Sequence, residues 1–117
     1  MPTSELGPGV VAWAQLDPVR GREQAGHRPV VIVSSLRHLH TVTSLAIVVP
    51  LTTVDRGWGN HVKLAGAVAL DRESWAMTEQ PRTISRDRLS SLAGRAHPRC
   101  LAEIRVWLAD FLDFSPR

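Results

Sequence analysis

The sequence has a single cysteine, no long apolar run and almost no lysine. Because Cys100 has no second cysteine to pair with, an intramolecular disulfide framework is excluded, and with it a secreted fold that depends on one. The apolar runs are much shorter than a membrane span, and residues 1–9 lack the basic and apolar regions of a signal peptide. The 117 residues therefore predict one soluble domain with no membrane segment, located in the cytoplasm.

Positive charge is carried by arginine, since Lys63 is the only lysine among 14 cationic residues. Arginine recognises phosphate through a planar, bidentate fork, although a GC-rich genome produces the same bias in composition. The position of the arginines is more informative than their number. Five of them lie between residues 82 and 99, against Asp87 as the only acidic residue of that segment. This segment predicts a basic surface that attracts polyanions.

Short apolar segments predict a mainly β (α+β) fold, a small barrel with a C-terminal amphipathic helix. Strands are expected at residues 10–16, 29–34, 45–52, 61–64, 67–70, 75–79, 82–85 and 91–95, and single helical turns near 37–43 and 86–89. The final helix begins near Pro98, and its apolar residues recur at helical spacing: Leu101, Ile104, Leu108, Phe111 and Leu112. Around this domain, residues 9–113, we expect a flexible arm at 1–8 and a tail at 114–117.

Alternation along the third expected strand separates two faces. Leu45, Ile47, Val49 and Leu51 share one face, so Thr52 is expected off the main apolar face, as a hydroxyl at a strand end. The next segment, 53–60, is rich in glycine and charge and predicts a mobile loop with an exposed tryptophan. The other three tryptophans lie in apolar segments and are expected to pack in the core or under the helix.

The sequence does not favour metal binding or nucleotide hydrolysis. His38 and His40 have neither a cysteine nor an acidic residue nearby, so a structural zinc site lacks ligands and a surface histidine pair is expected. The Gly57-Trp58-Gly59 segment lacks the Lys-Ser/Thr ending of a phosphate-binding loop. We therefore expect no metal and no cofactor.

Polar groups gather at three expected strand ends: Glu23-Gln24 before Arg28, the pair Thr52-Thr53, and Glu79-Gln80 before Arg82. A carboxylate, a guanidinium and a hydroxyl suffice for metal-free transesterification of RNA. The base takes the 2′-hydroxyl proton, the arginine stabilises the phosphorane, and an acid protonates the leaving 5′-oxygen. Taken singly, each group is better explained as a surface ion pair or a turn-capping hydroxyl, since surface pairs are common and weak.

Five segments, taken in order, resemble the MazF/PemK/Kid toxins of bacterial toxin-antitoxin modules. They read GVVAW from Gly9, LDP from Leu16, EQAGHRPVVIV from Glu23, VVPLTT from Val48 and EQPRTI from Glu79. The resemblance implies an SH3-like barrel, a homodimer and a metal-independent endoribonuclease that cuts single-stranded RNA at short sequences. It also implies products with a 2′,3′-cyclic phosphate and a 5′-hydroxyl, and a MazE-like antitoxin whose acidic segment covers the basic groove.

The resemblance makes Arg28 and Thr52 the catalytic pair, with Glu23 and Glu79 as further catalytic candidates. Resemblance or position in the chain makes seven more residues candidates for RNA binding: Arg22, His27, Thr53, Trp58, Gln80, Arg82 and Arg86. Kid-like members have an arginine where this chain has Met77 and a histidine where it has Arg22. Many relatives also have a proline where Gly59 stands. The general base therefore remains open between Glu23, Glu79 and water, and the acid remains open too.

Two other functions stay open. A gyrase-inhibiting toxin of the same fold acts by binding and carries its contacting aromatic residue at the extreme C-terminus. This chain instead ends Phe114-Ser-Pro-Arg117 and keeps Arg28 and Thr52. The second alternative is an RNA-binding regulator that does not cleave. Incubating the protein with labelled RNA and with gyrase separates all three functions.

Overall fold

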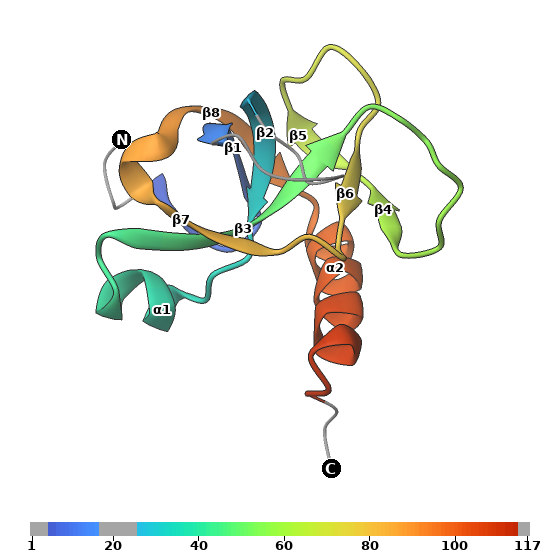
Figure 1. Cartoon of the computed structure of the whole chain (residues 1–117). Helices are drawn as coiled ribbons and strands as arrows, with labels where there is room; N and C mark the ends of the chain where they lie inside the picture. Colours follow the sequence, from blue (N-terminus) through green and yellow to red (C-terminus); the bar gives the residue numbers. More distant parts are fainter. Residues whose placement is uncertain (1–4, 17–25, 115–117) are drawn as a thin grey trace.

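The computed structural model describes residues 5–16 and 26–114, and within them a strongly curved sheet with a helix at its C-terminal end (Figure 1). The strands are β1 (Val10–Leu16), β2 (Gly26–Ile32), β3 (Leu45–Thr52), β4 (His61–Lys63), β5 (Gly66–Val68), β6 (Trp75–Met77), β7 (Arg82–Ser85) and β8 (Leu89–Ala96). The helices are α1 (Leu36–Thr41), the 3₁₀ turn η2 (Arg86–Arg88) and α2 (Pro98–Phe111). This arrangement confirms the mainly β fold with a C-terminal helix.

The strands pair antiparallel in the order β4-β6-β3-β2-β1-β8-β5, and β7 also pairs with β3. One edge of β3 serves two partners in turn. Its first half pairs with β7, where Ala46 faces Ile84, and its end pairs with β6, where Thr52 faces Trp75. This exchange of partners bends the sheet away from a flat layer. It also brings the segments after β3 and β6 to different ends of the same edge.

The core consists of two clusters, one on each face of the sheet. One cluster packs against Leu39 of α1, and the other packs against Ile104 of α2. Because side chains alternate along a strand, β3 places Val48 in the first cluster and Val49 and Leu51 in the second. The same alternation holds for β1, as its sequence predicts. Trp13, Trp75 and Trp107 are half-buried.

The alternation predicted for β3 is present, but the strand is buried on both faces rather than mainly on one. Leu45 and Ile47, expected on the main apolar face, are only half-buried. Thr52, expected off that face, is 5% exposed. The strand has two buried faces because α1 covers one and α2 the other, and the period-two pattern within β3 carries no sign of either helix.

The packed domain begins before residue 9. Leu6 is 6% exposed and belongs to the cluster under α1. Immediately after it, the N–H of Gly9 donates to the main-chain oxygen of Ile32 at 2.7 Å. The predicted flexible arm at residues 1–8 is therefore too long, since its last residues contribute to the core. Residues 1–4 lie outside the described part of the chain.

Helix α2 begins as its sequence predicts and ends more exposed than expected. His97 caps it through Nδ1, which accepts from the N–H of Arg99 at 3.1 Å, and Pro98 takes the first helical turn. Leu101 and Ile104 are buried, as predicted, whereas Phe111 is 48% exposed, as the last turns extend past the sheet (Figure 1). None of the helices in the described ranges is long and apolar enough to cross a bilayer.

Strands β5 and β8 approach each other so closely that two of their positions require glycine. A Cβ atom on Gly94 would lie 2.1 Å from the main-chain oxygen of Ala67, and φ at Gly94 is 139°. A Cβ atom on Gly66 would likewise lie 2.5 Å from the oxygen of Arg95. The absence of these side chains lets the two strands pair at the edge of the sheet.

Candidate functional site

Three predicted site residues, from two segments distant in the sequence, line one cleft. Arg28 is exposed near the start of β2, where Pro29 and the pairing with Ala14 hold the main chain extended. Thr53 follows the end of β3. The Arg28 cleft has a volume of about 210 Å³ and is lined by Trp13, His27, Arg28, Pro29, Thr53, Ala69, Leu70, Asp71, Arg72 and Ser74. The structure therefore brings a guanidinium and a hydroxyl together across two strands.

His27 is held at the edge of the Arg28 cleft by two contacts. Its ring stacks on Trp13, with centroids 5.2 Å apart and an interplanar angle of 22°. Its Nε2 lies 3.1 Å from Oγ of Ser90, and Ser90 in turn donates to the main-chain oxygen of Trp13 at 3.4 Å. Sequence reasoning missed Ser90, since it lies 63 residues from His27 and falls between the expected helical turn at 86–89 and the expected strand at 91–95.

The two adjacent threonines have different surroundings. Oγ1 of Thr52 accepts a hydrogen bond from the N–H of Val54 at 3.1 Å, which shapes the turn out of β3. The hydroxyl proton of Thr52 is not used in this bond. Thr53 is exposed and lines the Arg28 cleft. The pair therefore offers one anchored hydroxyl and one open hydroxyl at the same strand end.

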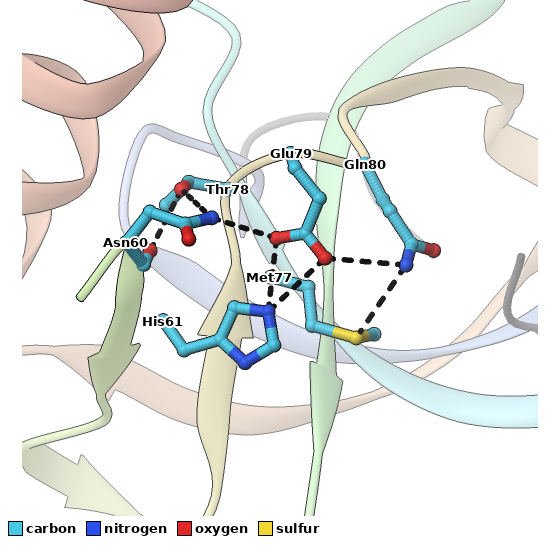
Figure 2. A network of polar contacts seen from close by, with 6 residues as sticks. All are labelled: Asn60, His61, Met77, Thr78, Glu79 and Gln80. Carbon is cyan, nitrogen blue, oxygen red and sulfur yellow. Dashed lines mark hydrogen bonds and ion pairs between the residues drawn. The ribbon is translucent and has the colours of Figure 1, made fainter. Parts of the chain in front are cut away.

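Glu79 is the centre of a polar network (Figure 2). Its two carboxylate oxygens lie 2.9 and 3.0 Å from Nε2 of His61, and Oε1 also accepts from Nδ2 of Asn60 at 2.8 Å. Burial acts to raise the pKa of Glu79. Hydrogen bonds from His61, the main chain and Asn60, together with the charge interaction with His61, outweigh burial and leave this pKa below its ordinary value. The carboxylate is thus kept ionised.

His61 and Asn60 were not predicted as site residues. The β4 segment carries only an alternating pattern, and its partner Glu79 is 18 residues away. Met77, where Kid-like members have an arginine, is buried, and its sulfur accepts from the Gln80 amide at 3.8 Å (Figure 2). A core residue thus replaces that arginine.

Glu79 lies in a second cleft, separate from Arg28. The Trp58 cleft has a volume of about 320 Å³ and is lined by Arg56, Trp58, Glu79 and Gln80. Thr52 pairs with Trp75 at the start of β6, and the chain runs from there through Met77 toward Glu79. The carboxylate therefore lies beyond the opposite end of β6 from Thr52. Among the described residues, the two clefts have no lining residue in common.

The remaining predicted residues fall into three groups. Trp58 is 46% exposed, as its loop predicts. Arg82 is half-buried in β7, and its Nη1 has no hydrogen-bond partner within the described residues. Glu23 and Arg22 lie in the range 17–25, outside the described part of the chain. Neither the Arg28 cleft nor the Trp58 cleft is lined by Arg82.

The hydrogen bonds of Arg86 disagree with its predicted role in RNA binding. Its guanidinium donates to the main-chain oxygens of Leu39 and Val42, and its Nε donates to that of Leu45 at 2.8 Å. These bonds tie η2 to the end of α1 and the start of β3. The guanidinium is engaged in holding these elements together, so we do not assign it to phosphate binding.

The two histidines considered as metal ligands lie on α1, where a helical turn was expected. Nδ1 of His38 is 2.8 Å from Oγ of Ser34, which also accepts from the N–H of Ile47 at 2.7 Å. His38 thus helps to hold α1 against β3. Within residues 5–16 and 26–114, no three side chains of histidine, cysteine, aspartate or glutamate gather as metal ligands would.

Comparisons with known proteins agree with this fold and these motifs. A sequence model of the PemK-like, MazF-like toxin of type II toxin-antitoxin systems matches residues 8–112. The endoribonuclease toxin MazF of Escherichia coli K12 is 34% identical over 99 residues, which are 84% of this chain and 86% of that protein. Endoribonuclease PemK of Escherichia coli is 40% identical over 87 residues, which are 69% of this chain and 62% of that protein.

Solved structures show the same architecture. The crystal structure of MazF from Deinococcus radiodurans matches with a TM-score of 0.80 at 26% identity, covering 92% of this chain and 96% of that one. A MazE-MazF structure from the same organism matches with a TM-score of 0.75 at 28% identity, covering 94% and 97%. Family model, sequence relatives and fold agree over nearly the whole described chain, and the chain therefore belongs to the PemK-like, MazF-like toxins of type II toxin-antitoxin systems.

Proposed function

We propose that this chain is the toxin of its module and acts as a sequence-specific, metal-independent endoribonuclease on single-stranded RNA. One observation carries the proposal: Arg28 and Thr53, from segments far apart in the sequence, line one cleft beside His27. The two Escherichia coli relatives are named endoribonucleases, and their identity to this chain supports the same activity. Cleavage of RNA by such an enzyme inhibits translation and growth.

The proposed reaction is an attack of the ribose 2′-oxygen on the adjacent phosphorus. The 2′-oxygen loses its proton to a base and bonds to phosphorus, and the bond from phosphorus to the 5′-oxygen breaks as an acid protonates that oxygen. Arg28 binds the phosphate and stabilises its added charge, and Thr52 donates its hydroxyl proton, which the bond from Val54 does not use, to a non-bridging oxygen. Glu23 is the proposed base, because it is a carboxylate and because the other candidate carboxylate, Glu79, lies in the Trp58 cleft.

The experiment that tests this function is incubation of the purified protein with single-stranded RNA in EDTA. We expect fragments with a 5′-hydroxyl and a 2′,3′-cyclic phosphate, and mapping of the 5′-hydroxyl ends gives the cleaved sequence. Binding without cleavage would instead favour an RNA-binding regulator. Inhibition of gyrase with intact RNA would favour the gyrase-directed alternative.

The partners proposed are a second copy of the chain and a MazE-like antitoxin. A MazE-MazF assembly is among the solved structures that match this chain, which supports an antitoxin partner. An acidic, flexible antitoxin segment would compete with RNA for the arginines that remain exposed, including Arg28, Arg95 and Arg99. The proposed location of the pair is the cytoplasm.

Removal of the Thr52 hydroxyl tests the proposed phosphate contact. Thr52→Val keeps the shape of the side chain and is expected to lower kcat by about 10²-fold, the cost of one lost donor to a developing charge. Thr53→Val is the matched control, since Thr53 is the next residue, is exposed and itself lines the Arg28 cleft, and it is expected to change KM more than kcat. Single-turnover cleavage of labelled RNA measures both. A loss of kcat in Thr53→Val alone would assign the donor to Thr53.

Trp58 is expected to stack an unpaired base. Its ring is 46% exposed, and aromatic faces bind bases of any kind in single strands. Trp58→Ala should weaken binding of single-stranded 2′-O-methyl RNA by about 1–3 kcal/mol, as judged from loss of one stacked base. Trp58→Phe retains an aromatic face and should recover most of the affinity. Equal affinity of the alanine variant and the parent protein, measured by fluorescence anisotropy, would remove the stacking contact.

A further inference from the structure

One buried imidazole fixes two walls of the Trp58 cleft. The side chain of His61 is 2% exposed, and its Nε2 contacts both oxygens of Glu79. Its ring also lies against the indole of Trp58, with centroids 4.9 Å apart and an interplanar angle of 44°. A carboxylate and an aromatic ring that would otherwise move independently are thereby held in one geometry.

The neighbours of His61 complete this support (Figure 2). Asn60 donates from Nδ2 to Glu79 and also to Oγ1 of Thr78 at 3.1 Å, while that hydroxyl donates to the main-chain oxygen of Asn60 at 2.7 Å. The opposite carboxylate oxygen, Oε2, accepts from His61 at 3.0 Å and from the Gln80 amide at 3.4 Å. Because the bond from Gln80 is long, Oε2 can accept a shorter bond from a ligand donor.

The chemistry of the Trp58 cleft fits an unpaired nucleobase. The indole provides a stacking face, Arg56 provides a cation for the phosphate, and the fixed carboxylate accepts from the edge of the base. A carboxylate accepts from the amino group of a base, as it does from the N4 amino group of cytosine, whereas uracil can offer only its N3–H. Uracil has no amino group. The volume of about 320 Å³ is within the range of small-ligand sites.

We propose that His61 is a positioning residue of the Trp58 cleft, which takes an unpaired base bearing an amino group. The inference rests on the proposed function, because that function supplies single-stranded RNA as the ligand. Among the described residues the Trp58 cleft and the Arg28 cleft have no wall in common. His61 therefore acts on the affinity for RNA and on the choice of base, and leaves the rate of bond cleavage unchanged.

Two substitutions of His61 separate its hydrogen bond from its volume. His61→Leu fills the space without a donor, whereas His61→Gln places an amide N–H near the position of Nε2. Val62→Ala is the matched control, since Val62 is buried in the same strand and has no contact with Glu79 in the described network. The exposed carboxylate gives an additional variant, Glu79→Gln, that does not disturb the core. Circular dichroism verifies that each variant is folded.

The probe is random-sequence, single-stranded 2′-O-methyl RNA, which has no free nucleophile and reports binding alone. We expect His61→Leu and Glu79→Gln to bind at least about tenfold more weakly than Val62→Ala, the loss associated with a hydrogen bond to a charged group. His61→Gln should restore most of the affinity. Sequencing of the bound pool should show one position enriched in amino-bearing bases for the parent protein, and no such enrichment for His61→Leu.

Three results would overturn the inference: affinity of His61→Leu equal to that of Val62→Ala, failure of His61→Gln to restore binding, or a fall in kcat on RNA at unchanged affinity. Failure of the proposed function gives a different pattern. A parent protein that does not cleave RNA disproves the nuclease activity, while binding of the 2′-O-methyl RNA still reports on the Trp58 cleft. The two hypotheses therefore fail independently.

Discussion

Replacement of Arg28 by alanine is expected to lower the rate of RNA cleavage by about 10²-fold to 10³-fold. Arg28 is the only arginine of β2. Its side chain lines the Arg28 cleft together with Thr53, and the scissile phosphate is proposed to bind there. Because Arg28 is exposed and its strand pairing uses the main chain, the thermal unfolding midpoint should stay close to that of the parent protein. Single-turnover cleavage in EDTA and circular dichroism measure the two quantities.

Two further variants are controls for Arg28→Ala. Arg28→Lys keeps the charge but loses the bidentate fork, so its rate should lie between those of the parent and the alanine variant. Arg105→Ala removes one exposed positive charge from α2, outside both clefts, and should leave kcat unchanged. An Arg28→Ala protein that cleaves as fast as Arg105→Ala would disprove the assignment of Arg28.

Gly94→Ala is expected to be the most destabilising glycine-to-alanine change among the described residues. The new Cβ atom would lie 2.1 Å from the main-chain oxygen of Ala67, and φ of 139° is strained for any residue with a side chain. Strands β5 and β8 must then separate. We expect the free energy of unfolding to fall by more than about 3 kcal/mol, a large part of the stability of a domain of this size.

Gly59→Ala is the matched control for Gly94→Ala. Nothing lies within 4 Å of a Cβ atom at Gly59, and its backbone is outside the left-handed region. Its free energy of unfolding should therefore stay within about 0.5 kcal/mol of the parent value. Urea unfolding followed by circular dichroism compares the two variants, and similar midpoints for both would contradict the close approach of β5 and β8.

Local patterns predicted the elements with strong periodicity. The bounds of β3 and β7 agree with the sequence prediction, and Leu101 and Ile104 lie on the buried face of α2. These features depend on residues close together in the chain, where period two or helical spacing is directly visible. The burial of Thr52 could not be predicted in this way, because the cover on each face of β3 comes from helices elsewhere in the sequence.

The candidate site was predictable where chemistry and resemblance coincide, and not where contacts are long-range. Arg28 and Thr53 were identified and lie in one cleft. His61 was missed because its contact with Glu79 spans 18 residues and forms only when β4 pairs with β6. Arg86 was assigned to RNA because a positive charge in a basic segment carries no sign of the carbonyl groups, 41 to 47 residues away, that accept its hydrogen bonds.

The separation of the two clefts has a consequence for how such a toxin diversifies. The Arg28 cleft and the Trp58 cleft lie toward opposite ends of β6, and their lining residues come from different segments. Substitutions at residues 56–61 can therefore accumulate without touching the groups proposed to break the bond. With RNA bound as proposed, we expect the recognised sequence to drift under selection while catalytic power is retained, and we expect randomisation of this one short loop to retarget the nuclease.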